Sequence, residues 1–122
     1  MADFLSEYSR LAAACQTVAY DDAESVQKFN RASDRMRQIV RDANSAGPET
    51  LLPLADLLTD PVSRRWIAHH LVELATIDTI TRNRCLDIVR DTAASLERDG
   101  QVADAMGERM WLKKWSLKDA DR

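Results

Sequence analysis

The sequence is poor in the residues that build loops, because only three glycines and three prolines occur among its 122 residues. A loop that cradles phosphate needs closely spaced glycines, and no such motif is present. No Ser/His/Asp arrangement and no pair of buried carboxylates can be assembled from these residues. The sequence therefore carries no catalytic signature, and we expect a non-enzymatic protein without a cofactor.

Cysteine and histidine are equally scarce. Cys15 and Cys85 stand far apart without a CxxC motif and fall on apolar positions, so we predict two small core residues instead of a disulfide or zinc site. The only histidines, His69 and His70, are adjacent, and neighbouring helical residues point about 100° apart, too far to share a metal. His69 lies one turn before Glu73, which makes an enzyme with a metal there the least favoured hypothesis. We predict no metal site and a histidine pair on a solvent or groove face.

Long apolar runs are missing as well, and none approaches the roughly 20 residues of a membrane-spanning helix. The segment MADFLSEYSRLAAAC has acidic residues where a secretion signal has basic ones. A formal net charge of -3 does not favour general binding to nucleic acid. We expect a cytoplasmic protein without membrane attachment.

The residues that do dominate are Ala, Leu, Arg, Asp and Glu, which favour helix. Apolar residues recur at steps of three and four, which predicts helices over residues 2–19, 23–45, 51–58, 61–75, 83–99 and 101–115. Connections of a few residues leave neighbouring helices antiparallel. We therefore predict a single all-α domain over residues 1–122, built as three stacked helical hairpins, with a frayed tail over residues 116–122.

The same periodicity predicts which side chains face inward. For the first two helices these are Phe4, Tyr8, Leu11, Cys15 and Val18, then Val26, Phe29, Ser33, Met36, Val40 and Ala43. For the last two they are Cys85, Ile88, Val89, Thr92 and Leu96, then Val102, Ala105, Met106, Met110, Leu112 and Trp115.

Short signals mark several helix ends. Asp21 or Asp22 is placed to cap the second helix, and Gly47 and Gly100 are placed to end the second and fifth. We also expect Pro48 in the first turn of the third helix and Pro53 within its first turn or so, where the missing amide is not needed. Asp60 is expected to cap the fourth helix, with Pro61 at its first position.

The segment LLPLADLL-TDP-VSRRWIAHHLVEL, residues 51–74, resembles one HEAT or armadillo-type repeat. The matching residues, in the places of the family's arginine, small pair and closing leucines, are Arg64, Ile67, Ala68, Leu71 and Leu74. Ser63 and Trp66 depart from the pattern. The resemblance, also to small bacterial helical domains of unknown function, implies a short α-solenoid and brings no activity.

A non-enzymatic protein–protein interaction module is the leading functional hypothesis, with bacterial toxin-neutralising immunity proteins as a specific version. Its partner would meet a groove on the fourth helix. The candidate binding residues are Arg64, Arg65, Trp66, His69, His70 and Glu73.

The alternative hypothesis is nucleic-acid binding through the last helix. Aromatic rings alternate there with basic side chains, a pattern that can stack on bases and bind phosphates. The candidate residues are Arg109, Trp111, Lys113, Lys114, Trp115 and Lys118.

Overall fold

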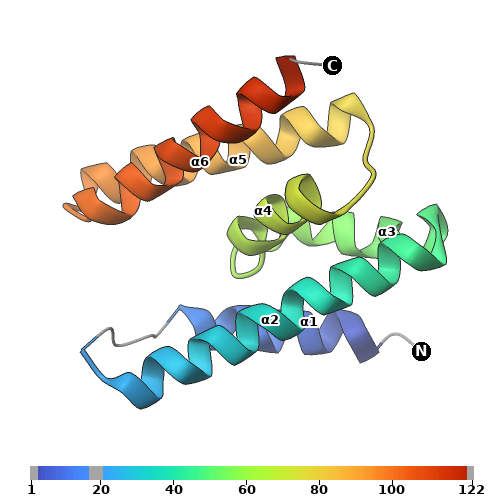
Figure 1. Cartoon of the computed structure of the whole chain (residues 1–122), viewed down its shortest axis with the longest axis horizontal. Coiled ribbons are helices and arrows are strands. Elements are labelled where there is room, and N and C mark those ends of the chain that lie inside the picture. Colours follow the sequence, from blue (N-terminus) through green and yellow to red (C-terminus); the bar gives the residue numbers. More distant parts are fainter. Residues whose placement is uncertain (1–2, 17–20, 121–122) are drawn as a thin grey trace. The chain divides into compact units, whose positions relative to one another are not determined.

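The computed structural model describes residues 3–16 and 21–120, and these residues form helices and no strands, so the all-α prediction is confirmed. The elements are α1 (Asp3–Cys15), α2 (Ala23–Ala46), α3 (Pro48–Ala55), the 3-10 helix η1 (Asp56–Thr59), α4 (Arg64–Leu74), α5 (Thr79–Arg98) and α6 (Val102–Ala120) (Figure 1). None of the described helices is both long enough and apolar enough to cross a membrane. The helices group into two compact units, residues 1–76 and residues 77–122.

The first unit packs α1, α2, α3, η1 and α4 around one core. The largest fully buried side chains in it are Tyr8, Met36, Val40, Leu54, Ile67 and Leu71. Phe29 contacts Trp66, and fifteen residues further along α2 the Asn44 side chain accepts a 2.9 Å hydrogen bond from the Thr76 amide. Because both contacts advance along the two helices together, α2 and α4 run in the same direction.

The ends of α2 follow the sequence signals. The Asp22 side chain accepts a 3.1 Å hydrogen bond from the Glu24 amide, so this aspartate is the cap. Gly47 ends the helix with a φ of 120°, a value that residues with a Cβ rarely adopt, while its amide donates to the Ala43 carbonyl. Both predictions are confirmed.

Two boundaries in the first unit differ from the prediction. The first helix ends at Cys15, and the predicted residues Val18 and Ala19 lie outside the described part of the chain. The third helix begins with Pro48 in its first turn, as predicted, but this makes Pro53 its sixth residue and not a first-turn residue. Because a proline there removes a helical hydrogen bond, the α-helix continues only to Ala55 and then tightens into η1.

The start of α4 also lies later than predicted. Residues 61–63 form a turn and the helix begins at Arg64, not at Pro61. Asp60 does hold this turn, since its side chain accepts a 3.4 Å hydrogen bond from the Val62 amide and its carbonyl accepts one of 2.9 Å from the Arg64 amide. Ser63 occupies the cap position, yet its side chain makes no capping hydrogen bond.

The second unit consists of α5 and α6 packed on each other. α5 begins at Thr79, four residues before the predicted start, because the Asp78 side chain accepts a 2.7 Å hydrogen bond from the Thr81 amide. This cap outweighs the weak helix propensity of the β-branched residues that follow it. The segment predicted as a link, residues 77–81, is therefore largely helical.

Gly100 closes α5 as predicted. It has a φ of 84°, and its amide donates to the Glu97 carbonyl while the Gln101 amide donates to the Leu96 carbonyl. These two hydrogen bonds form a Schellman motif, which satisfies carbonyls that the helix end leaves open.

The buried faces match the prediction only in part. Met36, Val40, Ala43, Cys85 and Val89 are buried as expected. Buried residues that the prediction omitted include Ala32, Ile39, Val72, Arg82, Leu86, Ala93 and Glu108. On α6 the prediction is wrong for Val102, Met106 and Met110, which are 56%, 58% and 69% exposed. The apolar residues of α6 are distributed around the whole helix, so their spacing does not determine which side packs against α5. The predicted tail is helical to Ala120.

We predict opposite effects for alanine at two glycines of the second unit. Gly107 lies inside α6 without a positive φ, and an added Cβ would meet nothing within 4 Å. Gly107→Ala should therefore stabilise the protein by about 0.5–1 kcal/mol, since alanine loses less backbone entropy. Gly100→Ala should destabilise it by about 1–2 kcal/mol, because the left-handed conformation penalises a Cβ. Urea unfolding followed by circular dichroism measures both, and a loss of stability in Gly107→Ala would contradict the first expectation.

Candidate binding surface

Three half-buried side chains of the first unit form an aromatic cluster, defined as Phe29, Arg65 and Trp66. The Phe29 and Trp66 rings, from α2 and α4, meet edge to face with centroids 5.9 Å apart and planes at 66°. The Arg65 guanidinium carbon lies 5.0 Å from the Trp66 ring centroid. Edge-to-face pairs and cation–π contacts of this kind each contribute about 0.5–1.5 kcal/mol. The cluster is thus a defined surface feature built from two helices.

An ion pair between α2 and α4 supports this cluster two turns further along α4. Arg37 Nη1 donates to Glu73 Oε1 over 3.0 Å, and the Glu73 side chain is only 15% exposed. His69 Nδ1 lies 3.9 Å from the other carboxylate oxygen. Because seven residues make two helical turns, Glu73 and Trp66 lie on the same face of α4. The structure therefore brings three of the predicted binding residues, Trp66, His69 and Glu73, onto one face.

His70, in contrast, belongs to the core. It is 2% exposed, and a 2.6 Å hydrogen bond joins its Nδ1 to the hydroxyl of Tyr8 on α1. The two rings also meet edge to face at 83°. The predicted placement of His70 on a solvent or groove face is therefore wrong. Its position, three residues after the fully buried Ile67, puts it on the inner side of α4, where Tyr8 satisfies its polar atom.

Both members of this pair are neutral at neutral pH. Burial, followed by the positive charge of Arg37, lowers the pKa of His70 to about 3. Burial also raises the pKa of Tyr8 far above its usual value. A neutral imidazole accepts a hydrogen bond at the nitrogen without a proton, so the hydroxyl donates to Nδ1 when the ring carries its proton on Nε2. The pair is suited to holding α1 against α4.

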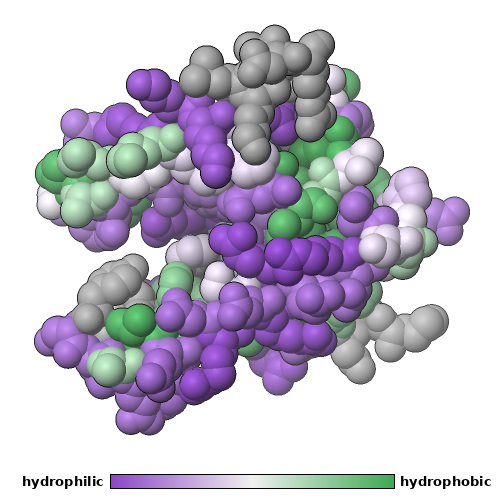
Figure 2. Space-filling view, viewed as in Figure 1, coloured by the Kyte–Doolittle hydropathy of each residue, from purple (hydrophilic) through white to green (hydrophobic). Residues whose placement is uncertain are grey.

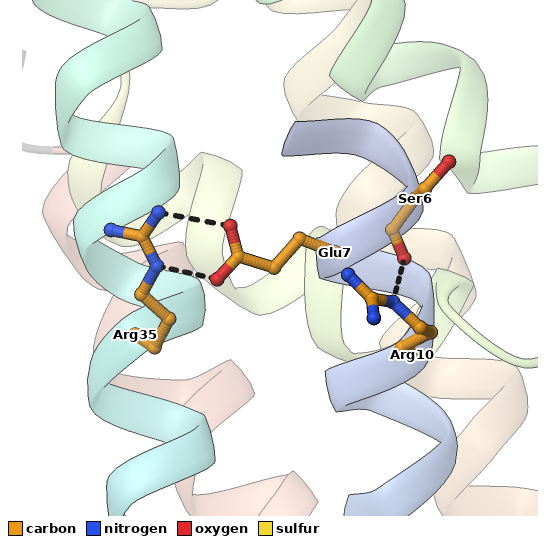
Figure 3. A network of polar contacts seen from close by, with 4 residues as sticks. All are labelled: Ser6, Glu7, Arg10 and Arg35. Atoms are coloured by element: carbon orange, nitrogen blue, oxygen red, sulfur yellow. Dashed lines mark hydrogen bonds and ion pairs between the residues drawn. The ribbon is translucent and has the colours of Figure 1, made fainter. Parts of the chain in front are cut away.

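A second clamp joins α1 to α2 at the surface (Figure 3). Arg35 Nε donates to Glu7 Oε2 over 2.7 Å, and Arg35 Nη2 donates to Glu7 Oε1 over 2.9 Å. The hydrogen bonds from Arg35 lower the pKa of the Glu7 carboxyl. On α1 itself, Arg10 Nε donates to the Ser6 carbonyl over 3.4 Å. This ion pair was not predicted, because nothing in a single sequence indicates which charged residues far apart in the chain form a pair.

The two arginines of α4 that were predicted as binding residues have different surroundings. Arg65 contacts the Trp66 ring, whereas Arg64 is an exposed residue at the start of the helix.

The predicted nucleic-acid residues all lie on α6, in the second unit. The Trp111 and Trp115 rings are half-buried with centroids 6.1 Å apart, and Lys114 Nζ lies 5.6 Å from the Trp115 centroid. Arg109 pairs with Glu97 over 2.6 Å, so its charge is already partly neutralised. Lys113 is exposed, and the Lys118 side chain lies outside the described part of the structure.

Both cysteines are buried, as predicted. Burial raises the pKa of Cys15 and raises that of Cys85 to about 12, so neither thiol ionises readily at neutral pH. Within residues 3–16 and 21–120, no group of three or more His, Cys, Asp or Glu side chains could hold a metal ion.

Comparisons with protein-family models, curated proteins and solved structures find no match to this chain. Its function must be inferred from the geometry of its own residues.

We predict that Tyr8→Phe destabilises the protein by about 1–3 kcal/mol, the cost of leaving the buried His70 nitrogen without its partner. The double variant Tyr8→Phe/His70→Leu removes both polar groups and should recover part of this loss. Urea unfolding of the two single variants and the double variant gives the coupling energy. Additive losses would show that the two side chains do not depend on each other.

We also predict that the free energy of unfolding decreases as the pH is lowered below about 6.5. An unfolded His70 binds a proton near pH 6.5, whereas the folded side chain does so only near pH 3. Its contribution is therefore complete above pH 6.5 and is lost as the pH falls toward 3, at up to about 1.4 kcal/mol per pH unit. Urea unfolding between pH 7 and pH 5 measures this slope. The slope should shrink in His70→Gln and persist in His69→Gln, and an unchanged slope in His70→Gln would refute the assignment.

Proposed function

We propose that the first unit is a non-enzymatic protein–protein interaction module that acts in the cytoplasm and contacts its partner through the aromatic cluster. The observation that carries the proposal is the half-buried Trp66, whose ring contacts the Phe29 ring from α2 and the Arg65 guanidinium. Tryptophan and arginine are among the residues most enriched at the centres of protein interfaces. Because the cluster has both, it offers a partner an apolar surface and a positive charge together.

Two contacts between helices hold the aromatic cluster in place and support this proposal. The Arg37–Glu73 ion pair joins the same two helices that carry the aromatic rings. The Tyr8–His70 hydrogen bond fixes the rotation of α4 from its inner side. A surface that is held in place before binding loses little conformational entropy when the partner arrives.

The helix directions support a stacked-hairpin architecture as part of the proposal. In a stack of HEAT-like hairpins the second helices of successive hairpins run in parallel. α2 and α4 run in the same direction, as expected if α1–α2 and α3–α4 are two such hairpins. Neutralisation of a bacterial toxin is a specific form of this proposal, in which the toxin is the partner.

Nucleic-acid binding through α6 is less well supported. The Glu97 carboxylate pairs with Arg109, which leaves less of its positive charge for phosphates. Titration with single-stranded DNA at low salt tests this alternative. A tryptophan fluorescence change that disappears steeply with salt would favour it over a protein partner.

We predict that Trp66→Ala and Arg65→Ala each weaken partner binding by at least about tenfold, because both truncate the centre of the proposed contact. Affinity capture with quantitative mass spectrometry compares these variants with wild type in the cells that express the protein. Arg31→Ala, an exposed arginine of α2, is the matched control and should retain the captured proteins.

Circular dichroism checks that each variant is folded, and Arg65→Ala keeps the test informative if Trp66→Ala loses stability. An identical set of captured proteins for all variants would refute the aromatic cluster as the contact surface. For the toxin version, co-expression with a neighbouring toxin should restore growth with wild type and fail with Trp66→Ala.

A further inference from the structure

The second unit exposes a row of apolar side chains along α6. Val102, Met106 and Met110 recur every fourth residue, so they line one face of the helix over about 12 Å. Apolar surface is visible at the end of this unit where α6 begins (Figure 2). Methionine is flexible and polarisable, and it is common at surfaces that accept apolar groups of varied shape.

Gly107 interrupts this helix beside the row. A glycine inside a helix costs roughly 0.5–1 kcal/mol relative to alanine. The fold does not explain this cost, since a Cβ at this position would meet nothing within 4 Å. A missing side chain lets the backbone of another helix approach closely, so the glycine suits a face that a second helix covers.

The charge on this face indicates the chemistry of that helix. Lys113 and Lys114 are exposed and lie three and four residues after Met110, and the Lys114 ammonium also lies 5.6 Å from the Trp115 ring centroid. Up to Lys114, the described residues of this side are Val102, Ala103, Met106, Gly107, Met110, Lys113 and Lys114, and none of them is acidic. A second copy of the chain would bring the same lysines and no carboxylate for them on this face. A partner with acidic residues next to its apolar ones satisfies both parts of the face.

We propose that this face of α6 binds an acidic amphipathic helix of a partner protein. Apolar residues of that helix cover Val102, Met106 and Met110, and its carboxylates pair with Lys113 and Lys114. Gly107 beside the row lets the backbone of a second helix approach this face closely, which fits a short helix better than a lipid surface. This binding face is distinct from the aromatic cluster, and its test does not depend on the proposed function of the first unit.

The test uses the full chain and a labelled synthetic peptide of about 16 residues, four helical turns, with leucines on one face and glutamates beside them. A control peptide carries lysine in place of each glutamate. Fluorescence anisotropy should show that wild type binds the acidic peptide at least about tenfold more tightly than the basic one. Lys113→Glu/Lys114→Glu should reverse this preference, and Met106→Ser/Met110→Ser should weaken binding of the acidic peptide about tenfold.

Two exposed positions elsewhere serve as matched controls, Leu52→Ser for the methionines and Arg84→Glu for the lysines, and both should bind like wild type. Equal affinity for the two peptides, or failure to bind either, would overturn the proposal. Vesicles of phosphatidylserine and phosphatidylcholine test a lipid surface, and preferential binding to them through the same residues would overturn it as well. So would concentration-dependent self-association in sedimentation that Met106→Ser/Met110→Ser abolishes.

Discussion

The hydrogen bond between Tyr8 and His70 is the constraint on which the first unit depends. Both groups are buried, and each would carry a desolvation penalty without the other. The bond therefore fixes how α4 is rotated against α1. With His70 inward, Trp66 one turn before it and Glu73 one turn after it face α2, where Phe29 and Arg37 meet them. A core contact thus positions the surface that we propose as the binding site.

Helix ends could be predicted from the sequence because they depend on few neighbours. Asp22 caps the amides that follow it, and Gly47 and Gly100 supply backbone conformations that other residues avoid. Pro53 shows the limit of such local rules. Its effect depends on how far it lies from the start of the helix, and with that start at Pro48 the second proline is the sixth residue, beyond the first turn.

Which face of a helix is buried could be predicted less well, because that choice is made by the partner helix. His70 was predicted as a surface residue because histidine is polar and does not count toward an apolar pattern. Its burial is offset by a hydrogen bond to Tyr8, which lies 62 residues away in the sequence. The candidate site was likewise predicted only in part. Trp66 stood out as a departure from the repeat pattern, whereas Phe29 was predicted as a core residue and the partner of Glu73 was not predicted.

The two proposed surfaces differ in the selectivity that their chemistry allows. The aromatic cluster consists of rigid rings held between two helices, so a partner must match a fixed shape and loses affinity sharply when it does not. The methionine row on α6 adapts to its ligand, and its selectivity comes mainly from Lys113 and Lys114. The proposed binding face also accounts for the wrong prediction on α6. If apolar residues serve both a partner and the contact with α5, the helix has no single apolar side, and its periodicity does not show which side is buried.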